Sequence, residues 1–224
     1  MPTFDVYTHG VEIKENLIPL DLIQAVIAEV EASSLKLPKH GVRNADKKFS
    51  SVLNLVTYGK LINEARNILG KEPQIVRVIF FDKTPEKNWL VTWHQDKTVA
   101  LSDKNEIEGW GPWTLKDKTH HVQPPVSVLN QMITFRVHLD SASSENGCLR
   151  VIPCSHENGI LKQKEIDELV KNTESVLCEV KAGDAVVMRP HILHSSSKSI
   201  VPEHRRVVHV EFSSYELPNE VNWA

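Results

Sequence analysis

The sequence of 224 residues contains only three cysteines, Cys148, Cys154 and Cys178, and none of them has CxxC spacing. An odd and sparse set argues against a disulfide framework and favours a reducing compartment. The first residues, Met1 to Asp5, do not combine a basic stretch with an apolar core, so no secretory signal is predicted. No apolar run approaches the length of a membrane span. We therefore expect a cytoplasmic protein without a membrane segment.

Strong charge of either sign is also missing. The formal net charge is -3 and the sequence pI is about 6.4. This balance gives no electrostatic reason to expect nucleic acid or an anionic membrane as a partner. The composition is that of an ordinary globular protein, with 41% hydrophobic and 25% charged residues. We expect one domain over residues 1–224, with no heptad or apolar stripe that would predict an oligomeric state.

Helical periodicity is concentrated in the N-terminal third. Leu22, Ile23, Val26, Ile27 and Val30 recur at helical spacing, with Asp21 as the expected N-cap. A second helix is predicted over residues 61–69, where Gly70 stands in the position of a C-terminal cap. One short helix is expected later, from Lys162 to Lys171.

Most of the remaining chain is rich in β-branched and aromatic residues. The predicted strands are 74–81, 89–93, 126–139, 148–152, 175–180, 184–188 and 206–212. Turn residues separate them at Asp82 to Pro85, Glu145 to Gly147 and Ala182 to Asp184. Helices followed by many short strands predict an α+β domain built on a β-sandwich or barrel.

The segment from Asp103 to Gln123 has no clear period. It contains two tryptophans, Trp110 and Trp113, and the pair His120-His121. A loop of this length in a compact domain usually has a function. Two interpretations stay open: a lid or wall over a substrate, or a loop that is packed only by its own tryptophans.

A metal site is predicted from one of three His-x-acid pairs. These pairs are His94/Asp96, His138/Asp140 and His209/Glu211. Alternate residues of a strand point the same way, so an imidazole and a carboxylate at this spacing can converge on one cation. His94 ends an apolar run and is followed by polar residues, which places its pair at a strand end where a cleft can open. Asp140 is interpreted as a turn residue and His138 as a partly buried histidine whose polar atoms are satisfied, while the third pair is expected to line the same cavity without binding metal.

The distal ligand has two candidates, His191 and His194. His194 shares its parity with Val186, Met188 and Ile192, the more uniformly apolar set. That set should face the core, so His194 is favoured and His191 is the alternative. Two imidazoles and one carboxylate form the facial triad of non-haem Fe(II) oxygenases.

Two arginines, Arg205 and Arg206, follow the distal histidines. An arginine fork pairs with a carboxylate in bidentate fashion, so one of them can hold the far carboxylate of a dicarboxylate co-substrate. We favour Arg205 for this role.

These motifs together resemble the phytanoyl-CoA dioxygenase family of Fe(II)/2-oxoglutarate-dependent oxygenases. The resemblance is carried by Trp93-His94-Gln95-Asp96, by the run from Asn146 to His156, and by Gly183-Asp184 leading to Leu193-His194-Ser195-Ser196 and Arg205-Arg206. It implies a double-stranded β-helix, a jelly-roll of the cupin type with flanking helices. It also implies His94, Asp96 and His194 as iron ligands, Arg205 as the 2-oxoglutarate anchor, and Gln95 and Ser196 as positions near the co-substrate. His156 is expected to be structural.

The activity that the resemblance implies is hydroxylation of an aliphatic C–H bond of a small organic molecule, with O2 and 2-oxoglutarate as co-substrates. Many relatives have glycine where Ser195 and Cys154 stand, and Arg136 occupies a place where some carry an aromatic residue. Two alternatives are kept. One is a cupin-like metalloenzyme that does not use 2-oxoglutarate, and the other is a jelly-roll module that binds a metal or small molecule without catalysis.

Overall fold

The computed structural model describes residues 4–34, 41–84, 86–201, 203–218 and 220–224. Pro85 of the expected turn and residues 1–3 of the expected N-terminus therefore lie outside the described residues. Among the described helices, none has both the length and the apolar character needed to cross a bilayer.

Two antiparallel sheets dominate the described part of the chain. The large sheet has the strand order β1-β11-β8-β13-β3-β2, and the small sheet has the order β10-β9-β12-β4. The strands of the large sheet are β1 (Val11–Lys14), β2 (Val42–Arg43), β3 (Gln74–Lys83), β8 (Met132–His138), β11 (Ala185–Met188) and β13 (Arg205–Ser213). Those of the small sheet are β4 (Val91–His94), β9 (Leu149–Val151), β10 (Val176–Cys178) and β12 (His194–Ser196).

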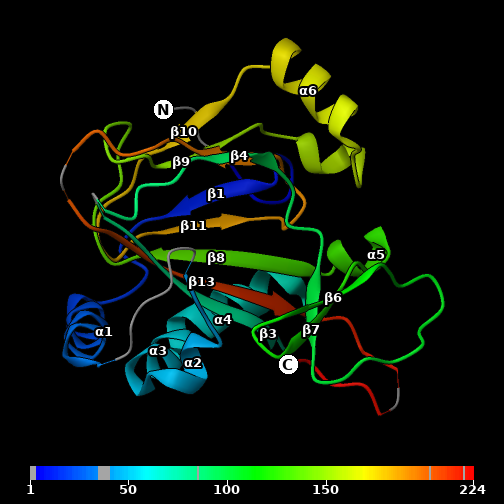
Figure 1. Ribbon diagram of the computed structural model, residues 1–224, viewed down its shortest axis with the longest axis horizontal. Helices are drawn as coiled ribbons and strands as arrows, with labels where there is room; N and C mark the ends of the chain where they lie inside the picture. Colours follow the sequence, from blue (N-terminus) through cyan, green and yellow to red (C-terminus); the bar gives the residue numbers. More distant parts are fainter. Residues whose placement is uncertain (1–3, 35–40, 85, 202, 219) are drawn as a thin grey trace.

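The two sheets face each other, and helices cover the outer side of the large sheet (Figure 1). This is the expected double-stranded β-helix, so the prediction of fold class is confirmed. The covering helices are α1 (Leu20–Ala32), α2 (Ala45–Lys48), α3 (Ser50–Val56) and α4 (Gly59–Leu69). Helix α4 ends at Gly70, whose φ of 70° is the left-handed conformation expected of a C-terminal glycine cap.

Side chains alternate between the two faces of the large sheet. The face toward the helices is apolar and contributes Phe80, Phe135, Val137, Val208 and Phe212 to the main hydrophobic core. The opposite face, toward the small sheet, carries Arg77, Arg136, Arg205 and His209, which line a cavity. Because the strand period is two residues, each long strand supplies the core and the cavity at once.

Two sequence-based predictions of local structure are wrong. Residues 126–139 do not form one strand: they form α5 (Val126–Leu129) and then β8. Pro125 precedes this turn of helix, and its fixed φ suits a helix start better than a central strand. Asp21 is not the N-cap of α1, because Pro19 occupies that position and Asp21 lies in the first turn.

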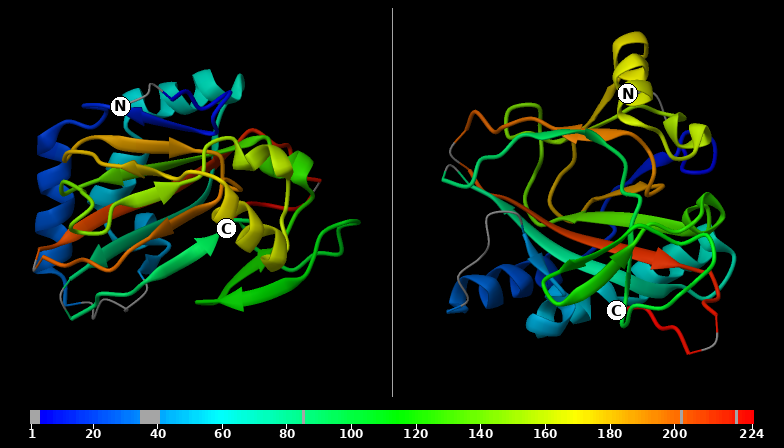
Figure 2. Two further views of the ribbon diagram at one scale, coloured as in Figure 1. Left: turned by 90° about the horizontal axis from the view of Figure 1, so that it is seen from above. Right: turned by 45° about the vertical axis from the view of Figure 1, so that its right-hand side comes forward.

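The segment from Asp103 to Gln123 contains a hairpin that sequence patterns did not predict. Strands β6 (Trp113–Lys116) and β7 (Thr119–Val122) pair with each other, and β5 (Val99–Leu101) pairs with β7. Asp117 and Lys118 have φ values of 51° and 64°, as in a two-residue primed turn. Trp110 and Trp113 pack against the cluster around Val76 and Met132. Figure 2 shows the hairpin beside one end of the two large layers.

The small sheet is covered on its outer side by α6 (Gln163–Asn172), close to the predicted helix (Figure 1). A 3-10 turn (Ser155–Asn158) precedes it. Ile166 of α6 packs with Ile152 and Leu193, behind the strands that carry the histidines. This packing fixes the back of the small sheet.

Candidate metal and co-substrate site

A cavity of about 440 Å³ lies between the inner faces of the sheets. Its walls contain His94 and His194 from the small sheet and Arg136, Arg205 and His209 from the large sheet. A larger cavity, of about 690 Å³, opens beside the edge strands β1 and β10, and its lining contains none of the predicted site residues. The size of a cavity does not identify the site here, whereas its side chains do.

The three expected metal ligands meet in the smaller cavity. His94 and His194 are direct cross-strand partners in β4 and β12, with their ring centroids 4.2 Å apart. The Nε2 atom of His94 lies 3.9 Å from Asp96 Oδ1, and that of His194 lies 3.6 Å from Asp96 Oδ2. All three ligand atoms fall within 4.8 Å of one another. This arrangement presents two nitrogens and one carboxylate to a common point.

Both histidines are oriented by their backbone. His94 Nδ1 lies 2.8 Å from the carbonyl oxygen of Thr92, and His194 Nδ1 lies 2.9 Å from that of Ile192. A carbonyl oxygen only accepts hydrogen bonds, so each Nδ1 carries the proton and donates it. Each Nε2 then has a lone pair that faces Asp96. The same two-residue geometry in two strands therefore prepares both rings as metal ligands.

The charges of the three groups suit a divalent cation. Burial by itself would raise the pKa of Asp96, but the neighbouring His194, His209 and His94 outweigh it and hold that pKa well below its usual value. Burial, followed by the nearby His94, lowers the pKa of His194 to about 3. At neutral pH the site thus offers a carboxylate and a neutral buried imidazole.

Arg205 lies in the same cavity and is buried. Its Nη2 atom donates to Ser196 Oγ at 3.3 Å, while Nε and Nη1 have no hydrogen-bond partner among the described residues. Burial, followed by Arg136, lowers the pKa of Arg205 to about 10, so the guanidinium is still charged at neutral pH. A buried charged fork with two unused donors is a fit for a carboxylate that is supplied by a ligand.

Ser196 organises the surroundings of Arg205. Its hydroxyl donates to the carbonyl oxygen of Gly147 at 2.7 Å and accepts from Lys83 Nζ at 3.2 Å as well as from Arg205. Burial, followed by Arg205 and Arg136, lowers the pKa of Lys83 to about 7. Ser196 therefore lies beside Arg205, the arginine that the sequence predicts to bind the co-substrate.

A chain of polar contacts crosses the floor of the cavity. Arg136 Nη1 donates to His209 Nδ1 at 3.1 Å, and because arginine cannot accept, the proton of His209 is on Nε2. That Nε2 donates to Glu211 Oε1 at 3.1 Å, and Glu211 also pairs with Arg77. His209 and Glu211 line the region next to Asp96, as expected, and both are already engaged by arginines.

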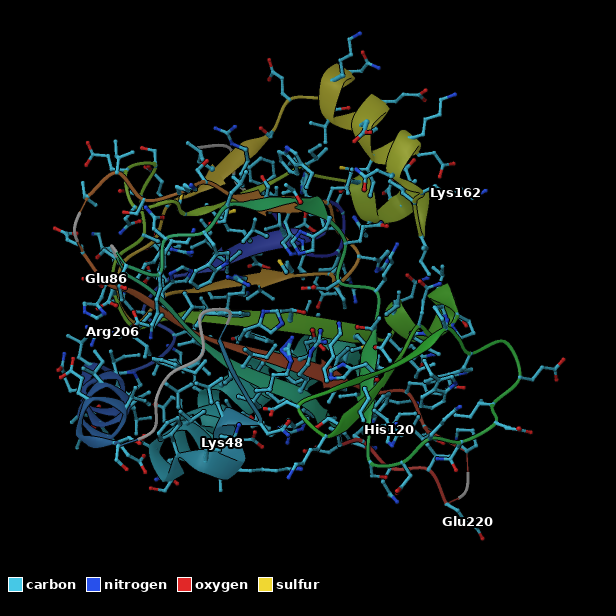
Figure 3. The ribbon with its side chains drawn as sticks, viewed as in Figure 1. Lys48, Glu86, His120, Lys162, Arg206 and Glu220 are labelled. Atoms are coloured by element: carbon cyan, nitrogen blue, oxygen red, sulfur yellow. The ribbon has the colours of Figure 1, made fainter. Side chains whose placement is uncertain are left out.

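The two alternative candidates, Arg206 and His191, both lie outside the candidate metal site. Arg206 faces away from the cavity and pairs with Asp140 and Glu31, 2.8 and 2.7 Å away, and Figure 3 shows it beside α1. His191 is buried and packs edge-on against His156, with ring centroids 6.1 Å apart, outside the triad.

His138 differs from its sequence interpretation. It is fully buried, not partly, and neither ring nitrogen has a hydrogen-bond partner among the described residues. Burial, followed by Arg136 and Arg205, lowers its pKa well below the usual value, so it is a neutral ring in the wall. Asp140 accepts a hydrogen bond from Arg206 and does not line the cavity.

Gln95 stands between two ligands, but its side-chain amide is occupied by backbone groups. The nitrogen donates to the carbonyl oxygens of Gly159 and His191 at 2.7 and 2.8 Å, and the oxygen accepts from Leu161 N at 2.8 Å. We therefore assign Gln95 to positioning, in place of the co-substrate contact expected from the resemblance. The lid candidates Trp110, Trp113, His120 and His121 do not line the cavity, whereas Lys116 of the same hairpin does.

Comparisons with known proteins show relatives by sequence and by fold. The chain is 26% identical over 193 residues to phytanoyl-CoA dioxygenase 1 of Oryza sativa subsp. japonica. That match covers 80% of this chain but spans only 58% of the length of the rice protein.

Solved structures with the same fold include AviO1 from Streptomyces viridochromogenes Tue57, with a TM-score of 0.70, 19% identity and coverage of 95% of this chain and 93% of that chain. HygX from Streptomyces hygroscopicus with nickel and 2-oxoglutarate bound gives a TM-score of 0.67 at 14% identity, over 95% of this chain and 88% of that chain. EctD from S. alaskensis with bound Fe gives 0.68 at 18% identity, over 93% and 74%.

The family description that matches the sequence is Phytanoyl-CoA dioxygenase (PhyH), over residues 37–207. This range is well over half of the chain and contains the triad and Arg205. The chain belongs to the phytanoyl-CoA dioxygenase family.

Proposed function

We propose that this protein is an Fe(II)- and 2-oxoglutarate-dependent dioxygenase that hydroxylates an aliphatic C–H bond of a small organic molecule. The observation that carries the proposal is the combination, in one cavity, of a His-Asp-His triad with a buried arginine whose donors are unused. Either feature alone is compatible with other chemistry. Together they match a metal and a dicarboxylate that occupy neighbouring positions.

The donor set fits ferrous iron. His94 and His194 would bind through Nε2 and Asp96 through one carboxylate oxygen, which leaves part of the coordination sphere for co-substrates. Iron supplies the O2 chemistry that no side chain in the cavity can perform. The side chain of His94 is 38% exposed, so small molecules can reach the ligand atoms from the cavity.

The co-substrate pocket fits 2-oxoglutarate. Arg205 would pair with the carboxylate remote from the metal, and Ser196 holds the guanidinium in place. Lys83 adds a second donor that reaches the same hydroxyl. HygX, which shares the fold, has been solved with nickel and 2-oxoglutarate bound, and this supports the same pairing of ligands here.

Release of succinate from 2-oxoglutarate tests the proposal. Purified protein with Fe(II), ascorbate and O2 should release succinate even without a prime substrate, because uncoupled turnover needs only the metal and 2-oxoglutarate. Omission of 2-oxoglutarate should abolish O2 consumption. The metal-binding variant His94→Ala is the negative control, and Lys171→Gln on the remote helix α6 is the positive control.

The alternatives give different results in the same assay. A cupin-like enzyme without 2-oxoglutarate would consume O2 or convert its substrate when 2-oxoglutarate is absent. A binding module would hold Fe(II) in equilibrium dialysis but release no succinate. Either result would overturn the proposal.

A further inference from the structure

The cavity is lined by more cationic side chains than the binding of 2-oxoglutarate requires. Its lining contains the side chains of Arg43, Arg77, Arg136, Arg205, Lys97 and Lys116, and Asp96 is the only acidic residue among those that line it in the described part of the chain. 2-Oxoglutarate uses Arg205 and the metal. Arg136 is engaged with His209, and Arg77 with Glu211.

Arg43, Lys97 and Lys116 are the cations left without a role, and of these Arg43 and Lys116 repel each other across the contact between β2 and the hairpin. Among the described residues, neither side chain makes a hydrogen bond or an ion pair. The acid that acts on Arg43 is Asp117, whose carboxylate is already paired with Lys48, 3.2 Å away, and the acid that acts on Lys116 is Asp96, one of the expected metal ligands. Two cations at the wall of a cavity, without protein anions, favour a ligand that brings its own negative charge.

These cations lie at the opposite end of the cavity from Arg205. Arg43 pairs in register with Ile79, and Arg77 pairs with Glu211. Ile79 pairs with His209, which is four residues or about 13 Å beyond Arg205 along β13, and Glu211 is six residues or about 20 Å beyond it. His209 and Glu211 lie close to Asp96, so these cations lie beside the expected metal ligands, on the side remote from Arg205. An anion at Arg43 would therefore not compete with the co-substrate.

The hairpin of β6 and β7 brings Lys116 to this end. Asn44, next to Arg43, donates from Nδ2 to Thr119 Oγ1 at 3.1 Å, and Lys48 holds Asp117 in the hairpin turn. Figure 3 labels Lys48 on α2 and His120 on β7, on either side of this contact. Lys116 pairs in register with the buried Thr119, so it points toward the same inner side.

We propose that Arg43, Arg77 and Lys116 form a binding subsite for a carboxylate or phosphate group of the prime substrate. Arg77 is nine-tenths buried, and its Nε has no hydrogen-bond partner among the described residues, so it offers a fixed donor at the base of the subsite. Burial, followed by Arg43 and Arg77, lowers the pKa of Lys116, and a bound anion would relieve this repulsion. The substrate would place its C–H bond near the metal and its anionic group near the hairpin. This inference rests on the proposed function.

Calorimetric titration with inorganic phosphate and with acetate tests the subsite. The titrations use protein saturated with Ni(II) and 2-oxoglutarate, so that Arg205 is already occupied, and are repeated on protein without either. The double variant Arg43→Gln/Lys116→Gln should weaken binding of the preferred anion at least about tenfold, the loss expected for two charge contacts of modest strength. The variant Lys164→Gln/Lys171→Gln, with the same charge change on α6, should bind as the wild type does.

A charge-retaining pair makes the result decisive. Arg43→Lys/Lys116→Arg should keep affinity within a few-fold, because it keeps both charges. Tighter phosphate binding would indicate a phosphorylated substrate, and tighter acetate binding a carboxylate. No measurable anion binding by the wild type, or equal losses in the α6 control, would overturn the subsite. Uncoupled succinate release by the wild type is measured in parallel, so failure of the proposed function is seen separately, as absent succinate.

Discussion

The two faces of the large sheet are built from alternate residues of the same strands, yet they have opposite chemistry. In β8, Phe135 and Val137 face the helices, whereas Arg136 and His138 face the cavity. The helix side is apolar and gains its free energy from burial. The cavity side holds buried charges and unpaired nitrogens, which cost free energy in the absence of ligands. Adjacent residues of one strand thus contribute to different properties, one to stability and the next to the cavity.

The largest expected effect is at the distal histidine, His194. His194→Ala should abolish Fe(II) binding and succinate release, because it removes a buried ligand. His191→Ala, three residues away, should keep both, because that ring packs against His156 outside the triad. Equilibrium dialysis with Fe(II) under anaerobic conditions measures the difference. Iron binding that survives in His194→Ala but is lost in His191→Ala would reverse the assignment.

Neighbouring residues of β8 should differ in their effect on folding. Phe135 packs edge-on against Phe212, with ring centroids 5.9 Å apart, so Phe135→Ala should lower the free energy of unfolding by about 3–5 kcal/mol. Thr134 is on the cavity side, and its buried hydroxyl has no partner among the described residues. Thr134→Val should therefore change stability by less than about 1 kcal/mol, or raise it. Urea denaturation of the metal-free proteins compares them, and equal losses would remove the distinction between the faces.

The adjacent residues Arg205 and Arg206 allow the two faces to be compared by their effect on the KM for 2-oxoglutarate. Arg205→Ala should raise the KM for 2-oxoglutarate about a hundredfold, since it removes a buried partner of a carboxylate. Arg206→Ala should leave KM within about twofold, because Arg206 pairs with Asp140 and Glu31 on the other face of the sheet and does not reach the cavity. Initial rates of succinate formation at varied 2-oxoglutarate give both constants. If Arg206→Ala had the larger effect, the anchor would be misassigned.

The smallest expected effect concerns Ser196. Ser196→Ala removes the hydroxyl that both Arg205 and Lys83 contact, but leaves the two cations in the cavity. We expect KM for 2-oxoglutarate to rise by about three- to tenfold, the effect of one ordinary hydrogen bond, with little change in kcat. Ser195→Ala, at the next position in β12, is the matched control and should have no effect on KM.

Sequence patterns predicted the triad because its signals are local. His94 and Asp96 share a strand end, and the apolar parity of Val186, Met188 and Ile192 favoured His194 over His191. The structure brings these residues together, although β11 ends at Met188 and the chain turns before β12 begins at His194. The parity argument thus selected the histidine that lies beside His94 and Asp96, although its assumption of one continuous strand was wrong.

Other parts could not be predicted because they depend on pairing between distant segments. Lys83 reaches Ser196, and Arg43 reaches the cavity, only through their register in the large sheet, and Lys116 reaches the cavity through the hairpin. Helices α2 and α3 are too short to show several turns of periodicity, and β-branched Val126 and Val128 made α5 look like a strand. His138 was expected to have hydrogen-bond partners, a point that only the surrounding strands can decide.

Gln95 separates His94 from Asp96, and its side-chain amide is hydrogen-bonded to three distant backbone groups. A residue with these contacts preorganises its neighbours: the distance between His94 and Asp96 is set before a metal ion binds, so the backbone needs little rearrangement on binding. The geometry of the proposed iron site therefore depends on Gln95, a side chain that is not itself a proposed ligand.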